Sequence, residues 1–245
     1  MRILIVKMTS FGDLLHVMPA LTDLARARSG QDPIEVDWLV EESFTEVPHW
    51  HPVVHRVIPV AMRRWRGLRW QYARELMGFI KELRQETYDV VIDAQGLMKS
   101  AVLSRFAKLR KGGRRVGYSS RSLKESPAAW LYGQRVEVGR AQHAVDRIRQ
   151  LMGQAMQYEL PAAQGDYALN EARGPEASPT KDANAVFLFH GTTWRTKHVP
   201  NEFWRALIER LLVLGFAPKL CWGNEDEQTR ANELARGFSS ILARR

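Results

Sequence analysis

Short apolar runs alternate with amphipathic stretches along this chain, and this order constrains the fold more than any other feature of the sequence. Residues 2–6 and 88–93 have the apolar, β-branched composition of buried strands, and a stretch with helical spacing of apolar residues follows each of them. Repeated strand-then-helix order is typical of a parallel sheet that helices cover on both faces. We therefore expect an α/β protein.

The spacing of apolar residues locates the individual elements. Strands are predicted at 2–6, 36–40, 56–60, 88–93 and 115–118, and helices at 13–28, 70–86, 98–109 and 141–156. Pro19 predicts a kink or break near Met18, because proline disrupts the interior of a helix. Pro59 cannot donate to a neighbouring strand, so 56–60 is expected at an edge or a strand end.

A change in composition divides the chain. Segment 161–184 contains Gly174, Pro175 and Pro179 among small and charged residues, which is typical of an interdomain connection. After it come a strand at 185–189, a helix at 201–214, a strand at 217–222 and a helix at 225–238. We therefore expect a domain at 1–160, a linker at 161–184 and a second domain at 185–245. Because such domains usually need roughly 100–150 residues, the second one is expected to be incomplete.

Charge and cysteine content narrow the partners and the compartment. Lys and Arg number 36 against 27 Asp and Glu, a net charge of +9, which favours nucleic acid, acidic membrane surfaces or phosphorylated small molecules as partners. The single cysteine, Cys221, excludes an internal disulfide. The apolar run at 3–6 is too short for a signal peptide or a membrane span. We expect a cytoplasmic protein that can contact a membrane surface.

Ligands of open parallel sheets bind beyond the carboxyl ends of the strands. This rule predicts functional loops at 8–13, 60–70 and 94–99. In the first loop, Gly12 permits a tight turn, and the carboxylate of Asp13 could accept a proton from a substrate hydroxyl. The alternative is that Asp13 only caps the following helix.

Two basic segments could bind an anion. Four arginines, at 63, 64, 66 and 69, lie close to Trp65 and Trp70 in the sequence. A second basic run at 108–115 precedes Arg121 and Lys124. Arginine binds phosphate and carboxylate through paired hydrogen bonds. Three interpretations stay open: a site for a phosphorylated acceptor, a single-stranded nucleic-acid surface, or an ordinary solvated face. No nucleic-acid-binding motif is recognisable in the sequence.

The segment 190–198 opens the second half with polar groups beyond a predicted strand. Its backbone N–H groups, the hydroxyls of Thr192 and Thr193, and Lys197 could cradle a phosphate, although the P-loop spacing is missing. The histidines at 49, 51 and 55 have neither the spacing nor the partners of a metal site. No metal site is therefore expected.

These segments, in their order and number, resemble glycosyltransferase family 9, and most closely its heptosyltransferase I members. The matching segments are 2–7, 10–16, 19–23, 37–42, 56–65, 92–100 and 142–147, followed by Thr192-Thr193, Lys197-His198, Trp222-Gly223 and Glu227. The resemblance covers nearly the whole chain, and no single motif decides it.

The resemblance implies a GT-B fold, with a Rossmann-like N-terminal domain and an incomplete second Rossmann-like domain. It implies inverting, metal-independent transfer of L-glycero-D-manno-heptose from ADP-heptose to Kdo of the lipopolysaccharide inner core, without a cofactor. The partners would be ADP-heptose and Kdo-lipid A, at the cytoplasmic face of the inner membrane, and no nucleic acid would be involved.

The resemblance also assigns roles to residues. Asp13 would be the general base on the acceptor hydroxyl. Acceptor-binding residues would be Arg63, Arg64, Gln95, Lys99 and Lys124. Donor-binding residues would be Gly12, Thr192, Thr193, Lys197 and Glu227.

The sequence departs from the family pattern after Glu227. The Asp-Thr-Gly segment with a following histidine, which grips the donor in the family, does not occur, nor does the family's C-terminal helix. We therefore expect this chain alone to have little or no activity and an unstable second half. Two alternatives remain: a heptosyltransferase with a different core acceptor, and a non-catalytic remnant that binds anionic lipopolysaccharide or a membrane surface.

Overall fold

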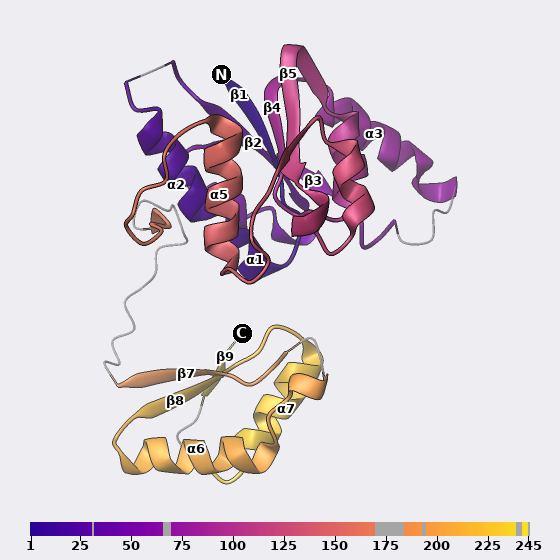
Figure 1. Ribbon diagram of the computed structural model, residues 1–245. Helices are drawn as coiled ribbons and strands as arrows, with labels where there is room; N and C mark the ends of the chain where they lie inside the picture. Colours follow the sequence, from indigo (N-terminus) through magenta and orange to yellow (C-terminus); the bar gives the residue numbers. More distant parts are fainter. Residues whose placement is uncertain (31, 66–69, 170–183, 193–194, 239–241, 245) are drawn as a thin grey trace. The chain divides into compact units, whose positions relative to one another are not determined.

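Figure 1 shows the computed structural model, which describes all residues except 31, 66–69, 170–183, 193–194, 239–241 and 245. The chain forms two compact units, Met1–Pro175 and Glu176–Arg245. The division between them falls inside the segment 161–184.

The first unit is a six-stranded parallel sheet in the order β3-β2-β1-β4-β5-β6. Its strands are β1 Arg2–Val6, β2 Glu35–Glu41, β3 Val54–Val60, β4 Thr87–Asp93, β5 Lys108–Tyr118 and β6 Gln134–Val136. Its helices are α1 Phe11–Leu15, α2 Met18–Ala27, α3 Ala73–Leu83, α4 Met98–Phe106 and α5 Ala144–Met156, with short 3-10 turns η1 Glu42–Phe44, η2 Val47–Trp50, η3 Trp70–Tyr72, η4 Ser120–Ser122 and η5 Ser126–Leu131. This is the strand order of the Rossmann fold, in which the strand order reverses between the parallel neighbours β1 and β4.

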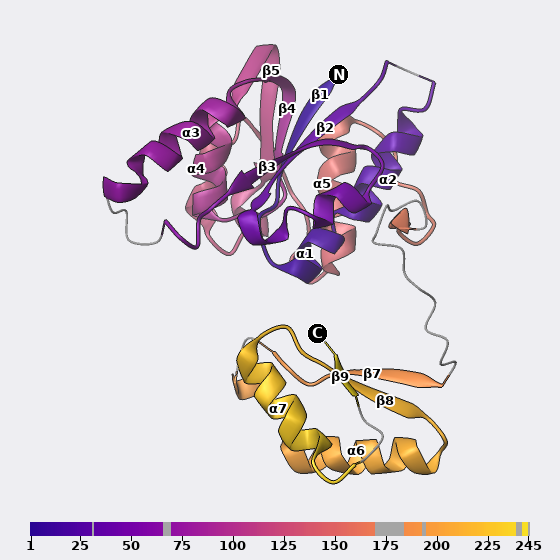
Figure 2. The same cartoon turned by 180° about the vertical axis from the view of Figure 1, so that it is seen from behind.

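Helices cover both faces of this sheet, as the sequence predicts (Figures 1 and 2). On one face, Leu21 of α2 and Met152 of α5 belong to a large apolar cluster. On the other, Leu83 of α3 and Leu103 of α4 belong to a second cluster. The central strand β1 therefore has no solvent-facing side, and its residues 3–6 are fully buried.

Both proline predictions are confirmed. The first predicted helix is broken: α1 ends at Leu15, α2 begins at Met18, and Pro19 lies in the first turn of α2, where its missing N–H costs nothing. Pro59 lies in β3, which among the described strands pairs with β2 alone and so forms an edge of the sheet.

The second basic run, at 108–115, lies in a strand that extends beyond the predicted bounds. Residues 108–115 form the first part of β5, which begins seven residues earlier than predicted and pairs with β4 through a register shift. The guanidinium of Arg115 is buried and donates to the carbonyls of Ser104 and Ala107 at the end of α4, while Arg114 donates to that of Ala155. These two arginines thus pair with the negative ends of helices.

The second unit is smaller and has a three-stranded parallel sheet in the order β7-β8-β9. Its elements are β7 Ala185–Phe189, η7 Arg195–Lys197, α6 Asn201–Val213, β8 Ala217–Cys221, α7 Glu225–Ala235 and β9 Leu242–Arg244. The third strand was not predicted, because three residues carry no periodic signal. Figures 1 and 2 show α6 and α7 on one face of the sheet, where Leu188, Ile208 and Leu234 form the core. The alternate residues Phe187 and Phe189 are exposed.

The start of segment 161–184 packs on the first unit. Arg149 of α5 donates to the carbonyl of Pro161 at 3.1 Å, and Arg26 of α2 pairs with Asp166. In the described part of the chain, no helix combines the length and the hydropathy that crossing a bilayer requires.

Candidate active site

A cavity of about 430 Å³ opens at the carboxyl ends of the strands in the first unit. Lys7 and Asp13 follow β1 and Gln95 follows β4, so the cavity lies where the strand order reverses, the position at which open α/β sheets bind ligands. Its lining residues are Lys7, Asp13, Ala94, Gln95, Gly96, Leu97, Tyr118, Ser122, Leu123, Lys124, Arg140, Ala144, Arg147 and Ile148.

Asp13 both caps α1 and faces this cavity. One carboxylate oxygen, Oδ2, accepts hydrogen bonds from the backbone N–H of Ser10 at 3.0 Å and from its hydroxyl at 2.8 Å. The other oxygen lies 4.0 Å from Nδ1 of His16. Burial alone would raise the pKa of Asp13, but the Ser10 hydrogen bonds and the charge of Lys7 together lower it. The carboxylate is therefore ionised at neutral pH, with Oδ1 accepting no hydrogen bond from the described residues.

Cations dominate the lining. Lys7 is 7% exposed, and its Nζ lies 3.5 Å from the carbonyl of Ala94. Burial lowers the pKa of Lys7, and the negative charges of Asp13 and Asp93 oppose that shift. Lys124, Arg140 and Arg147 complete four cations around one lining carboxylate. A cavity with this charge favours an anionic ligand.

Arg147 and Lys7 were not predicted as site residues. The guanidinium of Arg147 donates to the carbonyl of Ser122 at 2.7 Å and lies 5.1 Å from the centre of the Tyr118 ring, which fixes its position. Both residues lie in segments that match the family, so their position directly after β1 and early in α5 could have identified them.

Buried Asp93, at the end of β4, shapes the floor of the cavity. Its carboxylate accepts hydrogen bonds from the backbone of Gln95 and Gly96 at 2.9 and 3.0 Å, and from the hydroxyl of Tyr132 at 2.7 Å. Gly96 has φ +69°, and a Cβ there would lie 2.7 Å from a methyl carbon of Leu123, so only glycine fits. The loop after β4 is thereby fixed.

Gln95, predicted to contact the acceptor, has its side-chain oxygen engaged elsewhere. This oxygen accepts hydrogen bonds from the backbone N–H groups of Met8 and Thr9 at 3.0 and 3.2 Å. Gln95 therefore joins the loops after β1 and β4, and it still lines the cavity beside Lys124, another predicted acceptor residue.

Arg63 and Arg64 follow β3 at the same end of the sheet, but neither lines this cavity. The guanidinium of Arg64 forms ion pairs with Glu42 at 2.9 Å and with Glu75 at 2.7 Å. That of Arg63 lies 5.2 Å from the centre of the Phe44 ring. The other two arginines of this run, at 66 and 69, lie outside the described residues.

Gly12 and Lys99 are also absent from the cavity lining. Gly12 is an exposed residue of α1, and a Cβ placed on it would meet nothing within 4 Å. It thus leaves room for a ligand to approach. Lys99 is exposed in the first turn of α4.

The predicted donor loop lies in the second unit, beyond the carboxyl end of β7. Gly191 and Thr192 are half-buried, Lys197 is exposed in η7, and Thr193 lies outside the described residues. Glu227 of α7 accepts a hydrogen bond from the N–H of Gly223 at 2.8 Å. A Cβ on Gly191 would lie 2.4 Å from a carboxylate oxygen of Glu227, so this contact also requires glycine. The structure thus brings three of the predicted donor residues (Thr192, Lys197 and Glu227) to one end of the second sheet.

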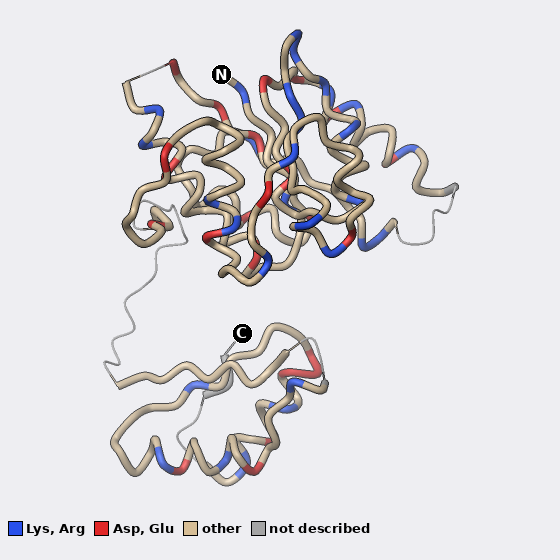
Figure 3. The backbone as a smooth tube through the Cα atoms, in the orientation of Figure 1, with Lys and Arg blue, Asp and Glu red and all other residues tan. Residues whose placement is uncertain are grey.

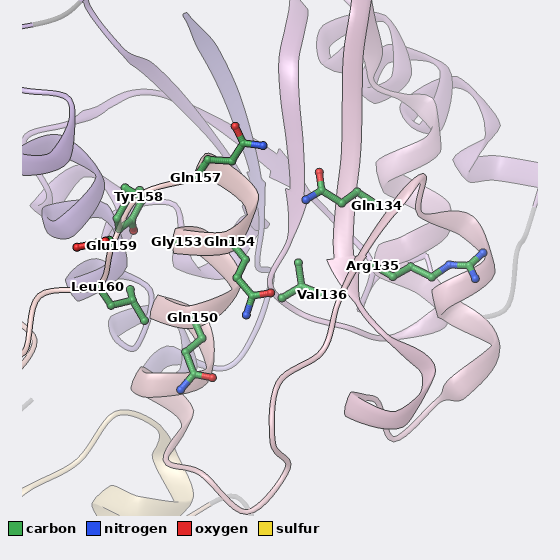
Figure 4. Close-up of a pocket in the computed structure, with 10 residues that line it drawn as sticks. All are labelled: Gln134, Arg135, Val136, Gln150, Gly153, Gln154, Gln157, Tyr158, Glu159 and Leu160. Carbon is green, nitrogen blue, oxygen red and sulfur yellow. The ribbon is translucent and has the colours of Figure 1, made fainter.

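A second cavity of about 520 Å³ lies between β6 and α5 (Figure 4). Amide side chains line it from both elements, Gln134 from β6 and Gln150 and Gln154 from α5. No predicted site residue lines it.

Figure 3 shows Lys and Arg both at the start of β5 and around the loops beyond the carboxyl ends of the strands, where the first cavity opens. The first cavity is therefore the stronger candidate for an anionic substrate.

Comparison with known proteins agrees with this architecture. A model of glycosyltransferase family 9 (heptosyltransferase) matches residues 76–244. Lipopolysaccharide heptosyltransferase 1 of Pseudomonas aeruginosa is 46% identical over 242 residues, which are 98% of this chain and 66% of the relative. The protein of the same name from Escherichia coli K12 is 44% identical over 245 residues, covering 98% of this chain and 74% of the relative.

A solved structure extends the likeness to three dimensions. The E. coli heptosyltransferase WaaC with ADP-2-deoxy-2-fluoro heptose matches with a TM-score of 0.89 at 42% identity, over 100% of this chain and 76% of that chain. The predicted fold class, α/β of the GT-B type with parallel Rossmann-like sheets, is confirmed. This chain spans about two thirds to three quarters of the length of these curated relatives. On the family model and on this identity, the chain belongs to glycosyltransferase family 9, the heptosyltransferases.

Proposed function

We propose that this chain transfers L-glycero-D-manno-heptose from ADP-heptose to a Kdo residue of the lipopolysaccharide inner core. The observation that carries the proposal is the position of Asp13, an ionised carboxylate on the lining of a cavity with four cations, where the strand order reverses. The names of the relatives, which are lipopolysaccharide heptosyltransferases, support the same reaction.

The acceptor proposal depends on charge. Kdo carries a carboxylate, and lysine and arginine bind such groups through charge-assisted hydrogen bonds. Lys7 and Arg147 are held in place by contacts with protein carbonyls, whereas Lys124 is exposed and can adapt to the ligand. The cavity therefore suits an acidic sugar better than a neutral one.

The chemical step would be a single displacement. The acceptor hydroxyl attacks the anomeric carbon of the heptose, the bond from that carbon to the ADP oxygen breaks, and ADP leaves with the electron pair. Asp13 takes the hydroxyl proton, a role that typically contributes about 10²–10⁴-fold in rate. Attack from the face opposite to ADP inverts the anomeric configuration.

The departing diphosphate would be stabilised by protein groups. In the proposed donor loop, Thr192 supplies a hydroxyl and Lys197 an ammonium group, beyond the carboxyl end of β7. Preorganised donors of this kind can stabilise developing negative charge. The proposed reaction therefore uses these groups in place of a metal or other cofactor.

The proposed setting is the cytoplasmic face of the inner membrane, where a lipid-linked acceptor would lie. The net charge of +9 would attract the chain to anionic lipids. Co-sedimentation with phosphatidylglycerol vesicles, at low and high salt, tests this peripheral association. Equal binding to neutral phosphatidylcholine vesicles would contradict it.

The decisive experiment incubates the purified 245-residue chain with ADP-heptose and Kdo-lipid A. ADP release and the mass of the product measure transfer, and calorimetry measures acceptor binding. Whatever the rate of the wild-type chain, we expect Asp13→Asn to lower transfer to the background rate while acceptor binding stays within a few-fold. Asp146→Asn is the matched control, because Asp146 also lies in the first turn of a helix but does not line the cavity. Equal loss in both variants would refute the role of Asp13.

A second candidate function is binding without transfer. Four cations would retain an anionic saccharide whether or not the donor reacts. Acceptor binding by the wild-type chain, with no ADP release and no product, would favour this function. A product formed only from an acceptor that already carries heptose would instead indicate a different core acceptor.

A further inference from the structure

We propose that Arg230 is a positioning residue of the donor loop and that it acts through a single tautomer of His198. The inference rests on the proposed function in one respect, the assignment of Thr192 and Lys197 to the donor diphosphate. The contacts themselves lie entirely within the second unit.

Arg230 projects from α7 and connects segments that precede and follow the donor loop. Its Nη1 donates to the carbonyl of His190 at 2.8 Å, at the end of β7. Its Nη2 donates to the carbonyl of Val199 at 2.6 Å, and its Nε donates to the side chain of Asn201, the first residue of α6, at 3.1 Å. One planar guanidinium therefore fixes both ends of the loop relative to each other.

His198 continues this network into the loop. One ring nitrogen, Nδ1, lies 3.1 Å from Nη1 of Arg230, and the other, Nε2, lies 2.9 Å from the carbonyl oxygen of Thr192. Arginine can only donate, so Nδ1 must accept. The carbonyl can only accept, so Nε2 must carry the proton. The two neighbours together allow only the neutral Nε2–H tautomer.

The consequence is a defined path from α7 to Thr192. Arg230 selects the tautomer, and His198 then holds the backbone of Thr192, a residue proposed to face the donor phosphates. Glu227 lies one helical turn before Arg230 on α7 and contacts Gly191. One face of α7 therefore contacts Gly191 through Glu227 and holds Thr192 through Arg230 and His198. Lys would supply a point charge at position 230 but could not make the forked contacts.

The test uses NMR on the 245-residue chain together with ADP titration. Long-range ¹H–¹⁵N spectra report which ring nitrogen of His198 is protonated, and the backbone amide signals of Gly191 and Thr192 report the loop. We expect the Nε2–H tautomer in the wild type and a mixture of tautomers in Arg230→Gln. We also expect ADP affinity to fall about tenfold in Arg230→Gln and in Arg230→Lys.

Arg205→Lys is the matched control. Arg205 is a half-buried guanidinium of α6 in the same unit and donates to the carbonyls of Leu234 and Arg236. It should therefore report general destabilisation without changing the His198 tautomer or the affinity for ADP. Equal effects of the two substitutions would reduce Arg230 to a structural role and overturn the proposal.

Two further outcomes separate this inference from the proposed function. A wild-type His198 protonated on Nδ1, or His198 and Thr192 signals that do not change in Arg230→Gln, would overturn the positioning role, even if ADP binds. The tautomer of His198 could instead change in Arg230→Gln as expected while the wild-type chain does not bind ADP. That result would overturn the donor assignment of the loop, and with it the role of Arg230 in donor binding.

Discussion

The side-chain oxygen of Gln95 accepts a hydrogen bond from the backbone N–H of Met8 at 3.0 Å, and another from Thr9 at 3.2 Å. One amide thereby joins the loops that follow the two central strands, β1 and β4. The loop after β1 leads directly to Ser10 and Asp13, so this bond links the position of the proposed base to the floor of the cavity.

Substitution Gln95→Met should disturb both stability and the site. Methionine has a similar length but no amide oxygen, so the N–H groups of Met8 and Thr9 would lose their partner. Leaving such groups unsatisfied costs about 1–3 kcal/mol in the free energy of unfolding. Urea unfolding measures the loss, and calorimetry should show weaker binding of a Kdo-containing acceptor.

Gln154→Met provides the control for this prediction. Gln154 lies on α5 beside the second cavity, and its side chain forms no hydrogen bond with any described residue. Its substitution should change the unfolding free energy by less than about 0.5 kcal/mol. Equal destabilisation by both variants would show that the bond across the loops contributes nothing specific.

The sequence predicted the central strands and the loops beyond them because these segments carry strong local patterns. Strand β1 is a continuous apolar run, and Asp13 follows it within a few residues. Strands β6 and β9 were missed because three residues are too few to show a period. Local pattern thus located the proposed base but not the full sheets.

The cations that line the cavity could not be predicted from the density of basic residues in the sequence. Arg63 and Arg64 stood out because basic residues are dense around them, yet Arg64 is paired with Glu42 and Glu75, acidic residues 22 and 11 positions away. Charge density did not indicate Lys7 or Arg147, which are far apart in the sequence and are brought to one cavity by the folding of β1 and α5. Composition shows how much positive charge a chain has, whereas tertiary structure decides which charges stay unpaired.

A buried ion pair between α2 and α5 should be important for the first unit. Nε of Arg149 lies 2.6 Å from a carboxylate oxygen of Asp23, and the two side chains are 9% and 3% exposed. Arg149→Met would leave a buried carboxylate without its partner, which costs about 3–5 kcal/mol. The double variant Arg149→Met with Asp23→Leu should lose less than the sum of the single losses in urea unfolding.

The exposed ion pair of Arg121 and Glu137 is the control for the single and double variants of the buried pair. Their side chains are 83% and 66% exposed at a separation of 3.8 Å. Arg121→Met should therefore cost less than about 1 kcal/mol. Strictly additive losses at Arg149 and Asp23 would mean that the buried charges do not interact.

Mild acid should destabilise the first unit through His51. Burial lowers the pKa of His51 to about 4 from its ordinary value of 6.5, and its ring lies 2.9 Å from the hydroxyl of Thr22. Between these two pH values the unfolded chain binds a proton that the folded chain does not. Stability contributed by neutral His51 is therefore present above pH 6.5 and is lost as the pH falls toward 4, by about 3 kcal/mol at most.

Urea unfolding at pH 7, 6 and 5 measures this dependence. The variant His51→Leu should start from a different stability but lose less of it over the same pH range. His49→Leu is the control, because His49 is exposed and its loss should leave the slope unchanged. If the wild type and His51→Leu have the same slope, other groups cause the acid sensitivity.

The two ends of the first sheet should differ in their response to loss of a cation. Lys124 lines the cavity beyond the carboxyl ends of the strands, and it forms no hydrogen bond or ion pair with the described residues. Arg110 lies near the start of β5, paired with Asp89 at 3.2 Å.

Because a hydrogen bond to a charged group contributes about 1.5–3 kcal/mol, Lys124→Gln should weaken binding of a Kdo-containing acceptor by about 10–100-fold. Arg110→Gln removes the same charge from the whole molecule, so it should leave this affinity within about twofold. Calorimetry at two salt concentrations checks both, and equal weakening by the two variants would mean that net charge, not the cavity, attracts the acceptor.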